Sequence, residues 1–211
     1  MSLDSRQALI EAALAMNASG INQGTSGNLS LRTGDGMLIT PSGIAYAALT
    51  PVDIVHVTMD GKASGLHRPS SEWRIHRDIF REREDARAIV HAHPGFCVTL
   101  ASLGRSIPAF HYMVAVAGGK DIRCAKYATF GTQALSDHVL VALRDRKACL
   151  MANHGLICLE RDLARALALA VEVEHLAKAY SQCLALGKPV ILDDAEMQRV
   201  VEKFDDYGQE A

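Results

Sequence analysis

Hydrophobic positions along the chain repeat with two periods, one of three to four residues and one of two. Leu9, Ile10 and Ala13, which follow Asp4, have the longer period and predict a first helix that ends near Gly20. Four further stretches are predicted to be helices, and the first of them begins with two residues suited to capping. These helices span residues 70–85, 132–145, 162–186 and 195–208.

Short alternating runs, with the period typical of strands, flank a Gly-Asp-Gly turn in residues 28–40 and predict a hairpin. Residues 54–61 and 86–94 predict single strands, and residues 147–159 predict a strand or a strand pair. Helices and strands alternate, but the hairpin comes early, which argues against a purely parallel sheet. We therefore expect an α/β fold with a mixed, largely antiparallel central sheet and helices on both faces.

Length and composition indicate an ordinary globular protein. Because the chain has 211 residues, 49% of them hydrophobic and 22% charged, we expect a single domain over residues 1–211. The formal net charge of -2 offers no basic surface for nucleic acid or anionic lipid, and no apolar run approaches the roughly 18 residues of a membrane span. We expect a cytoplasmic protein, in which five cysteines without CxxC spacing are buried thiols rather than disulfides or metal ligands.

Two histidines, His91 and His93, stand one residue apart in the predicted strand 86–94, directly before Pro94. Positions two apart in a strand point to the same face, so these two imidazoles can share a metal ion. Pro94 favours an extended conformation at His93 and ends the hydrogen bonding there, which places the pair at the exit of the strand. Taken alone, this spacing fits two ordinary buried histidines as well as half of a metal site.

Zinc needs three or four ligands, and two other side chains could complete such a site. His154 follows an apolar strand and precedes Gly155, which permits a tight turn at a strand exit. Glu72 stands at the start of a predicted helix, where the helix dipole favours a carboxylate. That favourable interaction by itself also explains a glutamate at this position.

Two other groupings have metal-binding spacing but lack partners. His76 lies four residues after Glu72 on the same helix face. Glu172 and His175 form one ExxH pair on the predicted long helix, whereas the ExxH sites of di-iron proteins come in pairs. We expect a solvated or capping role for these side chains rather than metal binding.

Three loops carry hydroxyls, an amide and glycines that suit an anion. They are GTSGNLS at 24–30, TPSG at 40–43 and PSS at 69–71. Ser70 and Ser71 also stand at the start of a predicted helix, where free backbone N–H groups bind phosphate. Each loop alone is a common turn sequence. Together, beside the candidate carboxylate ligand, they suggest a phosphate held one substrate length from a metal.

The order and spacing of these segments resemble the class II aldolase/adducin family, most closely its L-fuculose-phosphate aldolase branch. The resemblance runs from about residue 5 to the terminal EKFDDYG and so covers nearly all of the chain. It implies a mixed α/β sheet and a ring of four subunits. The segments that carry it are NQGTSGNLS, MLITPSGI, PSSEWRIH, AIVHAHP, SIPAFHYMVAVAGG, YATFGT and NHGLI.

The resemblance implies one zinc ion per subunit, held by His91, His93 and His154. Glu72 would be a fourth ligand or a base displaced from the metal. Tyr112 would reach from a neighbouring subunit as a proton donor, so that sites lie at the subunit interfaces of a homotetramer. It also implies phosphate binding by Thr25, Asn28, Ser42, Gly43, Ser70 and Ser71, and an aldehyde end shaped by Phe130 and Tyr207.

The activity that this resemblance implies is a zinc-dependent aldolase, a carbon-carbon lyase. Its substrate would be a ketose 1-phosphate, such as L-fuculose 1-phosphate or a 5-deoxy- or 5-methylthio-pentulose 1-phosphate, cleaved to dihydroxyacetone phosphate and an aldehyde. Two alternatives stay open: a pentulose-phosphate 4-epimerase or methylthioribulose-1-phosphate dehydratase on the same scaffold, and a non-catalytic adducin-like module. Glu72 favours an aldolase, because the epimerases usually carry aspartate there, and the module tends to lose the metal ligands.

Overall fold

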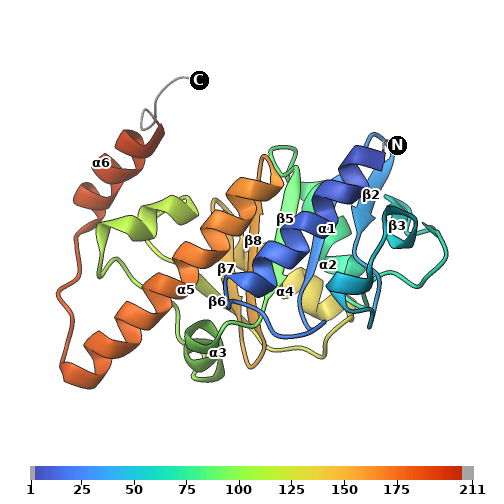
Figure 1. Ribbon diagram of the computed structural model, residues 1–211. Helices are drawn as coiled ribbons and strands as arrows, with labels where there is room; N and C mark the ends of the chain where they lie inside the picture. The colour runs from blue at the N-terminus through green and yellow to red at the C-terminus, as the bar shows by residue number, and fades with distance from the viewer. Residues whose placement is uncertain (1–2, 206–211) are drawn as a thin grey trace.

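The computed structural model describes residues 3–205, which contain one continuous eight-stranded sheet (Figure 1). Within these residues the pairing is antiparallel except at one edge, so the predicted mixed and largely antiparallel sheet is confirmed. From one edge to the other the sheet contains β4 (Ala63–Ser64), β3 (Val55–Thr58), β2 (Gly36–Ile39), β1 (Asn28–Arg32), β5 (Ala88–Ala92), β8 (Gly155–Glu160), β7 (Ala148–Met151) and β6 (Arg123–Ala125), with β6 parallel to β7.

Helices cover both faces of the sheet, as predicted. The α-helices are α1 (Leu3–Ala18), α2 (Trp73–Glu82), α3 (Gly95–Ser102), α4 (Gln133–Ala142), α5 (Leu163–Leu186) and α6 (Asp194–Asp205). Short 3-10 helices are η1 (Tyr46–Ala48), η2 (Pro51–Asp53) and η3 (Tyr112–Ala117).

Each face of the sheet has its own hydrophobic core. The helices α1 and α5 lie side by side on one face with α3 beside them, whereas α2 and α4 pack on the other face (Figure 1). The two cores arise because successive strand residues point to opposite faces. In β5, Ala88, Val90 and Ala92 belong to the core under α5, and Ile89 belongs to the core under α2. His91 follows the same alternation and therefore points toward the layer that contains α2.

Most predicted elements are found, with differences at their ends. The hairpin predicted in residues 28–40 is β1–β2, and residues 147–159 form the hairpin β7–β8. The helix predicted from residue 70 begins at Trp73, and its N-cap is Glu72 rather than a serine. The Oγ of Ser70 instead accepts the backbone N–H of Glu72 at 3.3 Å. The short elements α3 and β6 were not predicted, because a period cannot be recognised over so few residues.

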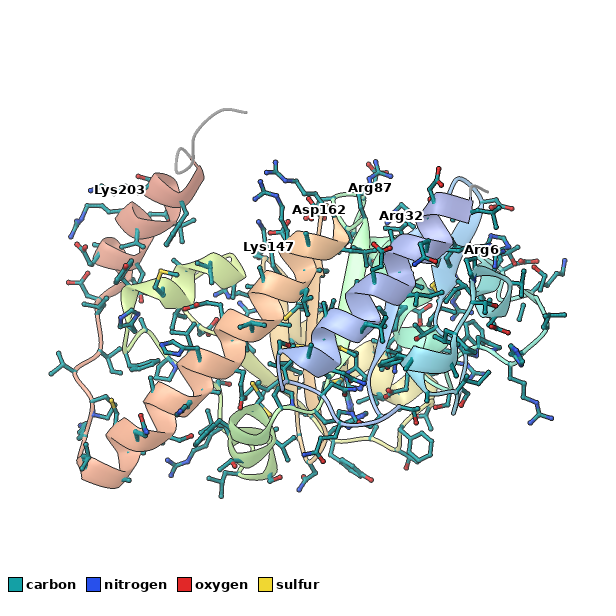
Figure 2. The ribbon with its side chains drawn as sticks, viewed as in Figure 1. Arg6, Arg32, Arg87, Lys147, Asp162 and Lys203 are labelled. Carbon is teal, nitrogen blue, oxygen red and sulfur yellow. The ribbon has the colours of Figure 1, made fainter. Side chains whose placement is uncertain are left out.

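Charged side chains surround the end of the sheet opposite α3. Arg87 precedes β5, Lys147 precedes β7 and Asp162 follows β8, and all three lie at this end (Figure 2). The Nζ of Lys147 lies 2.8 Å from a carboxylate oxygen of Glu160 there. Among the helices that the structure describes, none has the length and apolar content needed to cross a membrane.

Candidate metal and substrate site

Segments that are far apart in the sequence meet where β5 passes into α3. His91 lies in β5, and His93 follows it directly before Pro94, the N-cap of α3. His154 lies in the turn between β7 and β8, and β8 pairs with β5. Glu72 is the N-cap of α2, which covers the face toward which His91 points. Strand pairing and helix packing thus bring the predicted ligands to one place.

The four side chains form a tight cluster. One potential ligand atom from each lies within 4.8 Å of the other three. His91 Nε2 is 2.9 Å from Glu72 Oε2, and His154 Nε2 is 3.2 Å from Glu72 Oε1. His93 Nε2 is 2.9 Å from His91 Nε2, and the imidazole centroids are 4.7 to 4.9 Å apart. In residues 3–205 no other group of three or more histidine, cysteine or acidic side chains has such an arrangement.

Two features of the cluster test whether it fits a metal ion. The Oε1 atom of Glu72 is buried and has no hydrogen-bond partner, because His154 is close but not aligned for a hydrogen bond. A buried acceptor without a partner costs about 1–3 kcal/mol, and contact with a cation removes this cost. Three imidazoles and one carboxylate are also a donor set that zinc takes. The residues present therefore fit a divalent metal ion.

The protonation states agree with this interpretation. Burial, with a contribution from the neighbouring His91, lowers the pKa of His93 to about 3 and that of His154 to about 4. Burial alone would raise the pKa of Glu72, but His91, His154 and Asn28 outweigh burial and bring it below its usual range. Burial alone would lower the pKa of His91, but the Glu72 carboxylate and the Leu156 carbonyl outweigh burial and raise it. At neutral pH His93 and His154 are thus neutral and Glu72 is ionised, the forms that bind metals, and a bound metal would take the place of the proton that Glu72 favours on His91.

The backbone around the cluster explains its local sequence. The Nδ1 of His91 is 2.7 Å from the carbonyl oxygen of Leu156, which fixes the ring orientation. The prediction that Gly155 serves a tight turn is wrong, because the left-handed residue of this turn is Asn153, with φ of 55°. Gly155 is required by close packing: a Cβ there would lie 2.4 Å from the carbonyl oxygen of Ala92 and 2.7 Å from the His93 ring.

A cavity of about 330 Å³ opens beside the cluster. Phe130, predicted to shape the aldehyde end, lines it and is 64% exposed. Tyr127 and Ala128 also line the cavity, and neither was predicted as a site residue. The available signal for Tyr127 was its place in the YATFGT segment, which also contains Phe130. The full lining is Ser26, Ser71, Glu72, His93, Tyr127, Ala128, Phe130, Asn153 and His154.

The loops predicted to bind phosphate converge only in part. Ser42 N donates to the Arg68 carbonyl at 3.1 Å and Ser70 N donates to the Thr40 carbonyl at 3.0 Å, so loops 40–43 and 69–71 are neighbours. Ser71 lines the cavity, and the adjoining Ser70 is buried. Thr25, Ser42 and Gly43 are exposed, whereas Asn28 is buried, and its amide contacts Glu72.

The remaining residues considered in the sequence are Tyr112, Tyr207 and His76. Tyr112 lies on η3, is 51% exposed and stacks on Phe204 of α6, and it does not line the cavity of its own chain. Tyr207 lies outside the described residues. The expectation of a solvated or capping role for His76 is wrong, because its side chain is completely buried between Ser30 and Asn28.

The sequence signature of the Class II Aldolase and Adducin N-terminal domain matches residues 7–181. The chain therefore belongs to this family, and the resemblance seen in its sequence segments is confirmed.

Similarity to individual proteins is high over nearly the whole chain. The 5-methylthioribulose-1-phosphate/5-deoxyribulose-1-phosphate aldolase of Rhodospirillum rubrum is 56% identical over 98% of this chain and 93% of its own length. The L-fuculose phosphate aldolase of Escherichia coli K12 is 52% identical over 95% of this chain and 94% of its own. A solved L-fuculose 1-phosphate aldolase superimposes with a TM-score of 0.94 at 40% identity, covering 97% of this chain and 98% of that one. The expectation of an aldolase-type enzyme is confirmed.

Proposed function

We propose that the protein is a zinc-dependent aldolase that cleaves a ketose 1-phosphate to dihydroxyacetone phosphate and an aldehyde. The observation that carries this proposal is the convergence of His91, His93, His154 and Glu72 beside a cavity. Zinc, one ion per subunit, is the metal that three imidazoles and a carboxylate suit best. The relatives named above, which are sugar-phosphate aldolases, support the reaction and the substrate class.

The proposed reaction assigns a proton to each of two side chains. A divalent ion held by the cluster supplies an electrophile that polarises the ketone and stabilises negative charge on the ketone fragment. When the carbon-carbon bond breaks, the hydroxyl of the leaving fragment loses its proton and the electron pair stays on the ketone fragment. Glu72, whose Oε1 is not hydrogen bonded, then transfers a proton to the carbon next to the ketone, where the electron pair was left. Tyr112 from a neighbouring subunit accepts the proton that the hydroxyl loses, and in the reverse reaction it donates a proton to the aldehyde oxygen.

The phosphate of the substrate would lie against the loops beside α2. Ser71 lines the cavity, and the neighbouring loop contributes Ser42 and Gly43. Asn28 donates one amide N–H to Glu72, so it would bind phosphate through the second. These groups are joined by Thr25 and Ser70 in the proposed phosphate site.

The aldehyde end would lie against aromatic side chains. Phe130 and Tyr127 line the cavity and are 64% and 60% exposed, so their rings are available to a substrate. We assign Tyr207 to the same end. An apolar wall suits a methyl or thiomethyl terminus better than a second phosphate, which points to L-fuculose 1-phosphate or a 5-deoxy- or 5-methylthio-pentulose 1-phosphate.

We propose a homotetramer with sites at subunit interfaces. Tyr112 is exposed on η3 and does not line the cavity of its own chain, which supports its use by a neighbour. We propose a cytoplasmic location, because all five cysteines are free thiols, as is usual in a reducing compartment.

A panel of ketose 1-phosphates tests the proposal. Purified protein loaded with zinc is incubated with each sugar phosphate, and dihydroxyacetone phosphate is measured with a coupled dehydrogenase. We expect this product from at least one substrate, and its loss after chelation. Consumption of a substrate without formation of dihydroxyacetone phosphate would indicate an epimerase or a dehydratase instead. Absence of a bound divalent metal would contradict the proposed aldolase and these alternatives alike.

A further inference from the structure

A buried chain of hydrogen bonds leads from β1 to the carboxylate of the cluster. Ser30 Oγ is 2.6 Å from His76 Nδ1, and His76 Nε2 is 2.6 Å from Asn28 Oδ1. Asn28 Nδ2 donates to Glu72 Oε2 at 3.0 Å. None of these four residues is more than 4% exposed, so water cannot replace the missing partner if one bond is lost.

The ionised carboxylate sets the direction of the whole chain. Glu72 Oε2 can only accept, so Asn28 must present its N–H to it and its Oδ1 to His76. His76 must then donate from Nε2 and accept at Nδ1 from the Ser30 hydroxyl. With the other imidazole tautomer, the Asn28 amide would turn and place its oxygen against the carboxylate.

The imidazole is kept neutral by its surroundings. Burial lowers the pKa of His76 to about 3, and the neighbouring His91 adds to this effect. A neutral ring has one donor and one acceptor nitrogen, which is what Asn28 on one side and Ser30 on the other require. An apolar side chain could fill the same volume, so packing alone does not account for a histidine here.

We propose that His76 is a positioning residue that holds the Asn28 amide and, through it, the Glu72 carboxylate in the orientation that binds metal. The Oε2 of Glu72 is then tied to Asn28, while Oε1 stays without a hydrogen bond and points into the cluster. This inference rests on the proposed metal-dependent function of the cluster. It gives a role to His76, the one histidine of α2, which is not a proposed ligand.

Two substitutions at His76 separate positioning from packing. His76→Gln places an amide N–H near the position of Nε2 and keeps the donor to Asn28, whereas His76→Asn reaches only the position of Nδ1 and loses it. Metal affinity is measured by Co²⁺ titration of the metal-free protein, followed by its absorption spectrum, and turnover is measured with the zinc-loaded protein. We expect His76→Asn to lower Co²⁺ affinity about 10- to 100-fold and kcat more than KM, and His76→Gln to retain most of both.

A matched control and a direct measurement complete the test. His56→Asn changes another buried histidine, whose partner is Asp35, and should leave Co²⁺ affinity unchanged. In the intact protein, side-chain ¹⁵N shifts should show His76 as the Nε2–H tautomer. Equal losses in His76→Gln and His76→Asn, or an Nδ1–H tautomer, would overturn the inference. If the unaltered protein neither binds Co²⁺ nor makes dihydroxyacetone phosphate, the proposed function fails, and the tautomer still decides the direction of the hydrogen bonds.

Discussion

At the scale of single residues, the position of the ligand His154 depends on the two residues beside it in the chain, Asn153 and Gly155. Gly155 has no side chain at the point where β8 begins against the end of β5. Asn153, two residues earlier, has the left-handed backbone that asparagine tolerates better than most residues. Together they hold His154 next to His93, so the geometry of the ligands is set by small and turn-forming neighbours.

Gly155→Ala is expected to destabilise the protein and weaken the cluster. The new Cβ would lie 2.4 Å from the backbone oxygen of Ala92, so β8 must shift away from β5. Overpacking of this kind costs about 1–3 kcal/mol, measured by urea unfolding of the metal-free protein. Gly34→Ala is the control, because a Cβ there meets nothing within 4 Å, and it should be nearly neutral. Equal stability of the two variants would contradict this account.

At the scale of elements, the helix after His93 is capped by a side chain from a neighbouring helix. Because the N-cap of α3 is Pro94, no side chain of its own closes this helix start. The carboxylate of Glu174, on α5, accepts the backbone N–H groups of Phe96 and Cys97 at 2.9 Å each. The long helix thus fixes the start of α3 and the strand exit before it.

Glu174→Ala should loosen this connection. Loss of a charged cap costs about 1–2 kcal/mol, which urea unfolding measures. Glu172→Ala, from the same helix, is the control and should cost less. We also expect weaker Co²⁺ binding in Glu174→Ala, because His93 directly precedes the capped helix. Unchanged stability and affinity would show that α3 holds its position without the cap.

Asp78 joins α2 to α4 and makes this contact dependent on pH. Burial alone would raise its pKa, but hydrogen bonds from Ser136, Gln133 and Arg77 outweigh burial and lower it. Because the folded-state pKa is below the unfolded value, the contribution is present above the unfolded pKa and is lost as pH falls through the folded pKa. We expect Asp78→Asn to be about 1–3 kcal/mol less stable at pH 7. That difference should shrink in acid, and unfolding curves at several pH values show whether it does.

At the scale of the whole molecule, the proposed assembly combines groups from two chains. Tyr112 and Glu72 lie on elements that do not share a cavity within one chain. Tyr112 borders a different cavity of about 960 Å³, formed between η3 and α6. A homotetramer with shared sites accounts for both positions.

Mixing two inactive variants tests this arrangement. Tyr112→Phe and Glu72→Gln are each expected to lose most activity, because each removes a proposed proton carrier. If they are unfolded and refolded together in equal amounts, about a quarter of the sites receive both native residues, and activity returns to roughly that fraction. Refolding each variant alone is the control. No recovery in tetramers shown to be mixed would indicate that each chain uses its own Tyr112.

The sequence by itself determined the elements and the residue types of the site. The period of two before Pro94 indicates that His91 and His93 lie at the end of a strand with their side chains on the same face. This could be predicted because the alternation of side chains is a local property of the backbone. The turn residues likewise indicate the hairpin of β1 and β2. Short elements such as α3 were not predicted, because they contain too few residues for a hydrophobic period to be recognised.

Only the tertiary structure decided which polar residues belong together. The helical pattern places His76 on the apolar face with Ile79 and Phe80, but its partners Ser30 and Asn28 lie 46 and 48 residues away and are set by the packing of the helix against β1. The same holds for Glu174, whose partners lie 77 and 78 residues earlier. Local periodicity specifies the direction of a side chain, whereas its partners are specified by the pairing and packing of distant segments. The candidate ligands could therefore be predicted from sequence, and the residues that orient them could not.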